Sequence, residues 1–263
     1  GHVRFRQSQP IEGKIKRAAV VREHGGWFVC LFCETDIPPL PATTGEIGID
    51  IGLKHVAVTS DGEFFENPRI LKQYEKRINK AQKKLSRKKK RSKNRKKVIE
   101  ELKRLYQKEK NTREDHLHKL TSKLIDENQV IIAEDLQVAN LVRKNKAKKD
   151  ENGKYLKNGQ AQKKGLNRFF SDVALGTLLH MLEYKALWYG RTFIRVPAHH
   201  TSSDCSECGW RNEDLTLADR EWKCLKCGTH HERDENAARN ILARGKEIIN
   251  KGAGTPLLHL EIQ

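Results

Sequence analysis

Four cysteines near the C-terminal end of the sequence are spaced as ligands of a single metal ion. They form two Cys-x-x-Cys pairs separated by the fifteen residues 209–223, a spacing typical of a four-cysteine zinc site. Two thiolates three residues apart on a tight turn bind one tetrahedral ion from the same side, and two such turns close its coordination shell. We therefore predict a structural zinc ion, with no open position for catalysis, held by Cys205, Cys208, Cys224 and Cys227.

The alternative to zinc is a pair of disulfides, which requires an oxidising compartment. The sequence gives no argument for one, because it opens on no secretory signal. Gly209 and Gly228 follow the second cysteine of each pair, where a knuckle turn needs a residue that tolerates positive φ. Cys30 and Cys33 have the same spacing but lie in an apolar strand, where alternation points them to opposite faces. We interpret these two as ordinary half-buried cysteines.

Three acidic residues stand at positions where an apolar or neutral residue would cost less free energy. Asp50 lies in an apolar strand with Gly48 and Gly52 on its own face, so that bare backbone beside it leaves room for an approaching group. Glu134 ends a second apolar strand, and Asp234 opens the predicted last helix. Each position invites a functional explanation.

Each carboxylate also has an ordinary interpretation: Asp234 as a helix N-cap, Glu134 as the solvent end of a strand, and Asp50 as a turn partner. Taken together they indicate more, because neighbouring carboxylates repel and must bind cations or take up protons. Magnesium prefers such hard oxygen ligands, and two Mg²⁺ ions roughly 3.5–4 Å apart activate water and stabilise the leaving oxygen of a phosphodiester. The residues alone thus indicate a candidate nuclease.

The composition indicates a nucleic-acid partner. The 263 residues include 52 Lys and Arg against 34 Asp and Glu, which gives a formal net charge of +18 and a sequence pI near 9.7. A surplus of this size attracts polyanions. No run approaches the roughly 18 apolar residues that a membrane span needs, so we expect no membrane partner and a cytoplasmic, nucleoid-associated protein.

Strands that alternate with helices predict an α/β core with inserted segments. Apolar runs indicate strands at residues 3–6, 15–22, 27–32, 46–52, 55–59, 64–65, 130–134 and 192–196. Helical patterns cover residues 71–127, 169–189 and 234 to about 249. The prolines between residues 38 and 41 indicate a domain boundary, and residues 142–165, which have almost no apolar content, predict a mobile basic loop.

The helical region contains a strongly basic stretch. Positions 80–97 carry twelve Lys or Arg and no acid, which predicts contact with nucleic-acid backbones; a solvated helix end is the alternative. Trp210 and Trp222 flank the cysteines and either stack on bases or support a small core. The basic residues expected to contact nucleic acid are Lys83, Lys84, Arg87, Lys88, Lys89, Lys90 and Arg91.

Four motifs now occur in an order that resembles the OrfB/TnpB proteins of insertion sequences, relatives of the compact type V CRISPR effectors. Each motif is weak alone, but the four in order around a zinc ribbon are highly specific, and the resemblance covers the chain from Gly1 to about Ile249. The motifs are Gly48-Ile49-Asp50-Ile51-Gly52-Leu53-Lys54, Ile132-Ala133-Glu134-Asp135-Leu136, Thr201-Ser202-Ser203-Asp204-Cys205-Ser206-Glu207-Cys208-Gly209 and Arg233-Asp234-Glu235-Asn236-Ala237-Ala238-Arg239-Asn240-Ile241.

The resemblance implies a RuvC-like nuclease of RNase H fold, with Asp50, Glu134 and Asp234 as catalytic ligands of Mg²⁺. It implies a transposon-encoded, RNA-guided DNA endonuclease whose partners are a guide RNA and target DNA. Glu232 is a departure, because relatives usually carry Asp there. The implied domains are part of a β-rich wedge at 1–44, a nuclease core at 45–200 with a basic helical insertion at 71–127, a zinc ribbon at 201–231, and the last helix and tail at 232–263.

The same resemblance places the front of the wedge and a helical recognition region before residue 1. The sequence starts at Gly1 and its only methionine is Met181, which fits that expectation, and full guide binding is expected to need the preceding region. A non-catalytic accessory factor or guided repressor in transposition is therefore an open alternative. A transposase that joins DNA strands is a third, since RNase H-like folds support that chemistry too.

Overall fold

The computed structural model describes residues 2–23, 26–216 and 218–252. It divides into two compact units, each of which is described by itself. The first unit comprises the chain up to Pro38 and Arg69–Asp115, and the second comprises Pro39–Pro68 and the residues from His116 onwards. The long helix α2, Lys93–Glu127, contributes its first part to one unit and its last part to the other.

The second unit is built on a mixed five-stranded sheet in the order β5-β4-β3-β6-β9. Strands β3, β6 and β9 are parallel to one another, while β4 and β5 continue from β3 as an antiparallel meander. The strands are β3 Glu46–Asp50, β4 His55–Thr59, β5 Phe64–Glu66, β6 Val130–Glu134 and β9 Thr192–Val196. The α/β class predicted from the sequence is confirmed.

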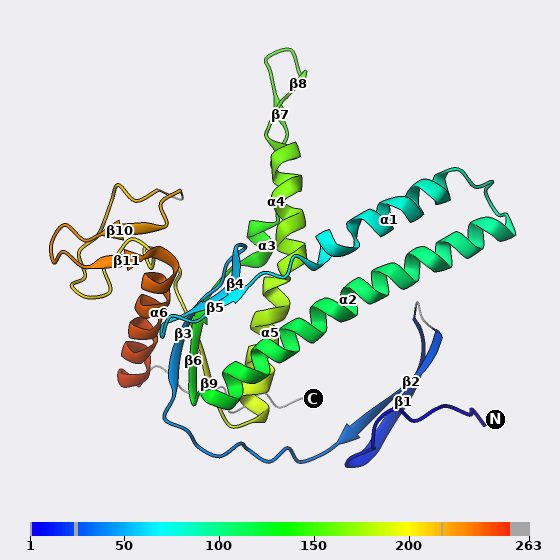
Figure 1. The fold of residues 1–263 in the computed structure, drawn as a ribbon, viewed down its shortest axis with the longest axis horizontal. Helices are drawn as coiled ribbons and strands as arrows, with labels where there is room; N and C mark the ends of the chain where they lie inside the picture. The colour runs from blue at the N-terminus through cyan, green and yellow to red at the C-terminus, as the bar shows by residue number, and fades with distance from the viewer. Residues whose placement is uncertain (1, 24–25, 217, 253–263) are drawn as a thin grey trace. The chain divides into compact units, whose positions relative to one another are not determined.

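Helices cover both faces of this sheet (Figure 1). On one face Ile49 and Ile131 join the main core with the end of α2 and with α5, Leu175–Trp188. On the other face Ile132 packs against α6, Arg233–Asn250. Parallel strands buried on both faces require nearly continuous apolar runs, which is the pattern of β3 and β6.

Helix α6 lies unusually close to β3. A Cβ built on Gly48 would be 2.2 Å from the carbonyl oxygen of Ala238 and 2.6 Å from the backbone nitrogen of Leu242. A Cβ on Gly245 of α6 would likewise be 2.3 Å from Cδ1 of Ile132. The group that approaches the bare backbone at Gly48 is therefore α6 itself.

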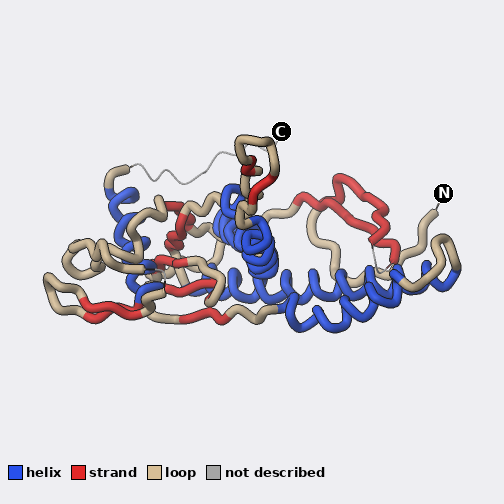
Figure 2. Tube along the Cα trace, turned by 90° about the horizontal axis from the view of Figure 1, so that it is seen from above, coloured by secondary structure: helices blue, strands red, loops and turns tan. Residues whose placement is uncertain are grey.

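The first unit contains a hairpin and a pair of helices. Strands β1, Lys14–Glu23, and β2, Gly26–Glu34, are antiparallel, and the guanidinium of Arg17 lies 4.3 Å from the ring centroid of Phe32. Helix α1, Ile70–Ser86, runs beside the first part of α2 (Figure 2). The predicted strand at residues 3–6 is wrong, because this segment pairs with no strand among the described residues.

The two helices are joined by a small apolar core. Ile78 and Ala81 of α1 pack on Leu105 of α2, with Tyr74 and Leu102 at the edge. Because these positions repeat every three or four residues, the helical period seen in the sequence is the packing seam of the pair. The basic residues lie outside that seam.

The segment from residue 138 to 190 is more regular than predicted. Within the expected loop, β7 Lys148–Lys149 and β8 Tyr155–Leu156 form a short hairpin, and helix α4, Gln160–Val173, has already begun. The single helix predicted at 169–189 is two helices, because Ala174 adopts a left-handed backbone with φ 56° between α4 and α5. A left-handed non-glycine residue cannot continue a helix. A four-residue helix, α3, spans Val138–Leu141.

Two short antiparallel strands, β10 Glu221–Lys223 and β11 His230–Glu232, follow the first cysteine pair and lead directly into α6. The expected C-terminal tail lies outside the described residues from position 253, as does Gly25. No helix in the described part of the chain is both long enough and apolar enough to cross a membrane.

Replacing Gly48 with Ala tests the close packing of α6. The new methyl group would overlap helix backbone, which cannot move aside as a flexible side chain can, so we expect the free energy of unfolding to fall by about 1–3 kcal/mol. Gly165→Ala in α4 is the control, because a Cβ there meets no atom within 4 Å; it should gain about 0.5–1 kcal/mol. Denaturant unfolding of both variants measures the difference, and an unchanged Gly48→Ala would contradict the packing.

Candidate functional site

Two of the three predicted carboxylates stand side by side at one edge of the sheet. Asp50 is the last residue of β3 and Glu134 the last of β6, and the register of these parallel strands pairs Ile49 with Ala133 just before them. Parallel strands present their carboxyl ends at the same edge. The two side chains lie close enough to interact, and the charge of Glu134 raises the pKa of Asp50.

Asp234 lies in the first turn of α6, close enough for its charge to act on Asp50. It is not the N-cap, because Glu232 takes that role and accepts a hydrogen bond from the backbone N–H of Glu235 at 2.8 Å. Asp234 instead accepts from the guanidinium of Arg233 at 2.8 Å and lies 3.6 Å from that of Arg220. The simple capping explanation for Asp234 is therefore wrong.

The electrostatics of the cluster follow from burial and repulsion. Burial raises the pKa of Asp50 well above its usual range, and the charges of Glu134 and Asp234 raise it further. Burial also raises the pKa of Glu134, against the hydrogen bond from Thr201, the hydrogen bond with Asp50 and the charge of Arg244. Asp50 is thus the central carboxylate, because it experiences both of the others.

A cluster that raises its own pKa values is one that a divalent cation relieves, because the cation replaces the proton and cancels the repulsion. The donor set is all oxygen, which suits Mg²⁺ or Mn²⁺. The three carboxylates do not converge on one point, since among the described residues only the cysteines gather their ligand atoms within 4.8 Å. Asp234 would have to exchange its contact with Arg233 for a metal ion.

The structure brings all four predicted cysteines together, and this cluster could hold a metal ion such as zinc. The sulfurs of Cys205 and Cys227 lie 3.6 Å apart, as do those of Cys208 and Cys224. Four sulfurs at about 2.3 Å from one tetrahedral ion are separated by roughly 3.8 Å, so the spacing fits. Gly209, with φ 72°, makes the predicted left-handed turn, and its backbone N–H donates to the carbonyl of Cys205.

Neighbouring groups support the cysteines. Nε2 of the buried His231 lies 3.0 Å from Sγ of Cys205, and Trp222 packs against the His231 ring. Contacts from the hydroxyl and backbone N–H of Thr229 lower the pKa of Cys227 to about 6, whereas burial raises the pKa of Cys205 to about 12. Trp222 is buried, which supports the interpretation that it packs in a small core and not the one that it stacks on bases.

The two N-terminal cysteines behave differently from the prediction in one respect. Cys30 is exposed and Cys33 is partly buried, and both are free thiols. They pair across the hairpin with Ala19 and Ile15, so each occupies an ordinary ladder position. Neither belongs to a metal-binding group in the described part of the chain.

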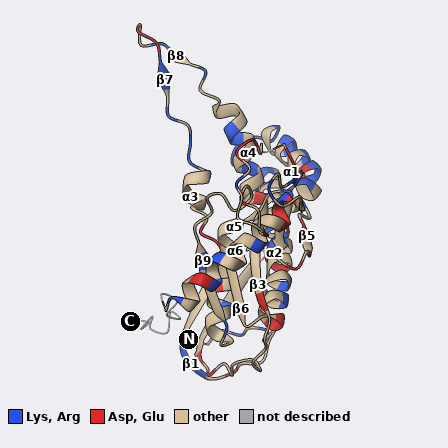
Figure 3. Cartoon of the chain, turned by 90° about the vertical axis from the view of Figure 1, so that its left-hand side faces the viewer, with Lys and Arg blue, Asp and Glu red and all other residues tan. Residues whose placement is uncertain are grey.

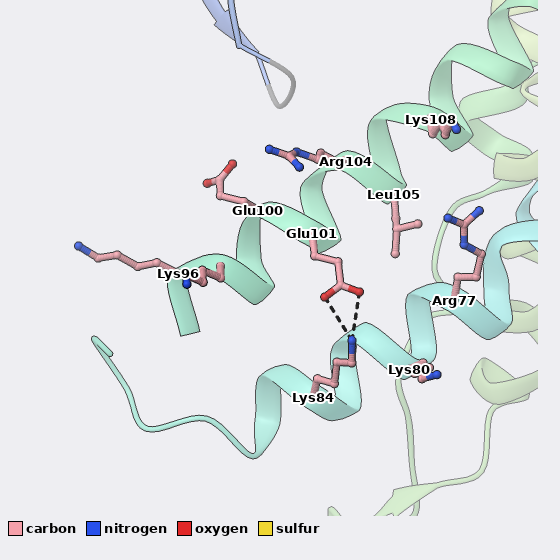
Figure 4. A pocket seen from close by; sticks show the side chains of 10 residues that line it. Arg77, Lys80, Lys84, Lys96, Glu100, Glu101, Arg104, Leu105 and Lys108 are labelled. Atoms are coloured by element: carbon pink, nitrogen blue, oxygen red, sulfur yellow. Dashed lines mark hydrogen bonds and ion pairs between the residues drawn. The ribbon is translucent and has the colours of Figure 1, made fainter. Parts of the chain in front are cut away.

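The predicted nucleic-acid residues all lie at or after the end of α1, and all seven are exposed. Figure 3 shows Lys and Arg gathered along α1. A groove of about 960 Å³ between α1 and α2 adds basic side chains that the sequence did not single out. In Figure 4, Arg77 and Lys80 project from α1 and Arg104 and Lys108 from α2.

The groove is only partly neutralised. Glu101 reaches Lys84 at 3.3 Å, and Glu100 reaches Lys103 at 3.0 Å. Lys84 is therefore paired with a carboxylate. The prediction had treated it as equivalent to the other six basic residues expected to contact nucleic acid. The lining residues are Arg77, Lys80, Lys84, Lys96, Lys97, Glu100, Glu101, Arg104, Leu105 and Lys108.

Comparison with known proteins decides the family. Residues 28–145 match the OrfB_IS605 family, described as a probable transposase, and residues 176–241 match the Cas12f1-like TNB domain. These two regions contain all three carboxylates and all four clustered cysteines. The chain is TnpB-like.

Relatives of the TnpB-like chain carry names that agree with this. It is 41% identical over 254 residues to a "Putative RNA-guided DNA endonuclease" of Streptomyces pristinaespiralis, covering 96% of this chain and 58% of the relative. It is 31% identical over 262 residues to "Putative RNA-guided DNA endonuclease InsQ" of Escherichia coli K12, covering 98% of this chain and 64% of the relative. The chain thus spans roughly three fifths of the length of these relatives.

The fold is similar to part of a solved Cas12f1 structure. The TnpB-like chain aligns with the protein in the cryo-EM structure of a Cas12f1-sgRNA-target DNA complex at a TM-score of 0.50 and 19% identity, over 84% of this chain and 54% of the other. A likeness at this identity establishes the fold alone.

Sequence reasoning did not single out three polar residues beside the site: Thr201, which donates to Glu134, and Asn236 and Asn240, which bind the loop that carries Thr201. All three lie inside the motifs that carried the family resemblance, so a signal was present. Their roles depend on which backbone groups they meet in space, and no spacing rule gives that. The groove was missed for the same reason, because its two walls are separated by the turn after α1.

Metal analysis tests the cysteine cluster. We expect about one zinc ion per chain, and loss of the ion with melting of the ribbon when Cys205 or Cys227 is replaced by Ser. Cys30→Ser and Cys33→Ser are matched controls that should keep the metal. Purified protein that is folded without any metal, or that loses metal with Cys30→Ser, would contradict the assignment.

Neutralising exposed lysines after α1 tests the basic surface. For Lys88→Ala with Lys89→Ala, we expect weaker binding to RNA and DNA of any sequence and a log-log salt slope smaller by about two. Lys246→Ala with Lys251→Ala removes the same charge from lysines paired with Glu46 and Glu247 and is the control. Binding titrations at several salt concentrations separate the two, and equal effects would refute a specific role for the α1 end.

Proposed function

We propose that the TnpB-like chain forms the nuclease part of an RNA-guided, Mg²⁺-dependent DNA endonuclease encoded by a transposable element. The observation that carries the proposal is the pair Asp50 and Glu134 at adjacent strand ends, with the charges of Glu134 and Asp234 both acting on Asp50. Such a cluster stores repulsion that a divalent cation relieves. The names of the relatives point to the same activity.

In this proposal Asp50, Glu134 and Asp234 would hold the metal ions, with Asp50 as the carboxylate that interacts with both of the others. Bound Mg²⁺ would supply an activated water and stabilise the leaving oxygen of the phosphodiester. The chain's own residues orient the ligands: Thr201 donates to Glu134, and α6 fixes Asp234 in its first turn.

We further propose that the core is RuvC-like, of RNase H type. Support comes from the mixed sheet with its helices on both faces and from the placement of two carboxylates at the ends of its parallel central strands. Ligands in α/β sheets bind outside the carboxyl ends of the strands, where these residues lie. The domain bounds expected from the sequence, with the ribbon at 201–231, remain part of this proposal.

The proposed partners are a guide RNA and its DNA target. The basic groove and the exposed lysines after α1 support contact with phosphate backbones, which the protein grips without reading bases. Zinc is the proposed ion of the ribbon, with a structural role because four thiolates leave no open position. The match to the TNB domain supports placing the ribbon near nucleic acid.

One observation favours a second candidate, a non-catalytic binding protein such as an accessory factor or guided repressor. The carboxylate of Asp234 is already neutralised by Arg233 and approached by Arg220, as in a site that needs no metal. In that case the affinity of the chain for RNA, and its affinity for DNA, would each be the same with and without divalent cations. The two functions differ in cleavage, not in binding.

Replacing Asp50 with Asn separates them. RNA that co-purifies with the protein is sequenced, and a plasmid that carries the matching target is incubated with the complex in Mg²⁺. We expect cleavage to fall by at least about a thousandfold in Asp50→Asn while DNA affinity is retained, because the central metal ligand is lost. Asp135→Asn, which changes the exposed neighbour of Glu134, should cut like the parent. Absence of metal-dependent cleavage in the parent would favour the binding protein.

A further inference from the structure

We propose that Thr201 is a positioning residue for Glu134 and that the segment 197–206, clamped to helix α6, couples the cysteine ribbon to the carboxylate site. The inference rests on the proposed function, since it concerns how one of its metal ligands is held. It assigns roles to Thr201, Asn236, Asn240 and Arg244.

The contact between Thr201 and Glu134 is buried. Thr201 is 3% exposed and Glu134 is 7% exposed, and Oγ1 of Thr201 lies 3.0 Å from Oε1 of Glu134. The same hydroxyl lies 3.0 Å from the carbonyl oxygen of Ala198, so its single proton has two acceptors. The charged carboxylate is the stronger acceptor. This bond fixes one oxygen of Glu134, whose carboxyl group also interacts with Asp50.

The side chain of Asn236, on α6, forms hydrogen bonds with the backbone of the segment 197–206. Its side chain is 1% exposed, and its Nδ2 donates to the carbonyl of Asp204 at 2.8 Å, with longer contacts to those of Thr201 and Ser202. Its Oδ1 accepts from the backbone N–H of Ser206 at 3.0 Å. A side chain that satisfies four backbone groups of one loop fixes the course of that loop.

One turn further along α6, Asn240 repeats the contact. Its Nδ2 donates to the carbonyl of Thr201 at 2.8 Å and to that of Asp204 at 2.7 Å. Because residues four apart share a helix face, Asn236 and Asn240 bind the same loop from one side of α6. The Thr201 backbone is thereby held by two amides while its hydroxyl reaches Glu134.

Arg244 continues the row by one more turn. It donates to the carbonyls of Pro197 at 3.0 Å and His199 at 2.7 Å, and its Nη2 lies 3.3 Å from Oδ2 of Asp204. His200, between these contacts, has a left-handed backbone with φ 62°, a conformation that a non-glycine residue keeps only when its surroundings impose it. Contacts from α6 therefore fix the backbone conformation of the segment 197–206.

The far end of the same segment enters the ribbon. Cys205 follows Asp204 directly, and the backbone N–H of Ser206 is the group that Asn236 binds. A metal ion at the cysteines therefore restrains a loop whose other contact is a catalytic carboxylate. Helix α6 also carries Asp234 in its first turn, so one helix positions two of the three carboxylates relative to the ribbon.

A purely structural role for Thr201 would make its effect appear in stability alone. Thr201→Val keeps the shape and removes the hydroxyl, whereas Thr201→Ser keeps the hydroxyl and removes a methyl group. Ser203→Ala is the matched control, since its hydroxyl lies in the same segment but reaches only the carbonyl of His200, at 3.5 Å. The readout is the affinity of the folded chain for Mn²⁺ alone, measured by electron paramagnetic resonance, with Asp50→Asn defining the baseline without the site.

We expect Thr201→Val to bind Mn²⁺ about 10–100-fold more weakly, the usual effect of losing a group that orients a ligand. Thr201→Ser should stay within about threefold of the parent, since a charge-assisted hydrogen bond is retained. Ser203→Ala should be unchanged, and all three should keep their zinc content and circular dichroism. Parent affinity in Thr201→Val overturns the inference.

Two further outcomes are distinguishable. If Thr201→Val loses its fold, Asn240→Ala takes its place, because Asn240 is only partly buried and supports the same loop; weaker Mn²⁺ binding supports the coupling, and parent-like binding overturns it. If the parent binds Mn²⁺ no better than Asp50→Asn, the proposed metal site itself fails and the inference with it.

Discussion

Electrostatic repulsion between carboxylates that the fold holds close together governs the candidate site. Adjacent parallel strands place Asp50 and Glu134 at the same edge, and neither side chain can leave without breaking the register of β3 and β6. Burial makes two charges there costly, so the pair holds a proton or binds a cation. Apolar packing on both faces of the sheet holds the central strands, and with them the two carboxylates, in place.

Helix α6 connects this edge of the sheet to the loop that leads into the cysteine cluster. The absence of a side chain at Gly48 lets the helix backbone approach β3, and the same helix bears Asp234 in its first turn. Its row of Asn236, Asn240 and Arg244 then holds the loop that leads into the cysteine cluster. A glycine that looks permissive in the sequence is thus a packing requirement. The match to a Cas12f1-like TNB domain covers α5, the ribbon and the start of α6, so ribbon and helix are recognised as one module.

The elements with a strong local signal were predictable. Strands β6 and β9 have the predicted bounds, and the cysteine spacing identified all four members of the cluster. The failures have physical causes: Ala174 breaks a helix by a backbone conformation that alanine rarely adopts, and residues 3–6 have apolar character without a partner strand among the described residues. The carboxylate cluster was predicted as a set, but its ion pair with Arg233 was not, because that contact depends on the side-chain rotamer at the start of α6. Family resemblance supplied the roles that spacing could not.

The central claim is that Asp50, Glu134 and Asp234 share divalent cations. Its most direct test is a crystal structure of the chain grown with Mn²⁺, with anomalous diffraction data recorded at the manganese edge. The account predicts anomalous peaks among the three carboxylates and movement of the Arg233 guanidinium away from Asp234. A well-ordered site without manganese, with Arg233 still bonded to Asp234 and a proton between Asp50 and Glu134, would contradict it.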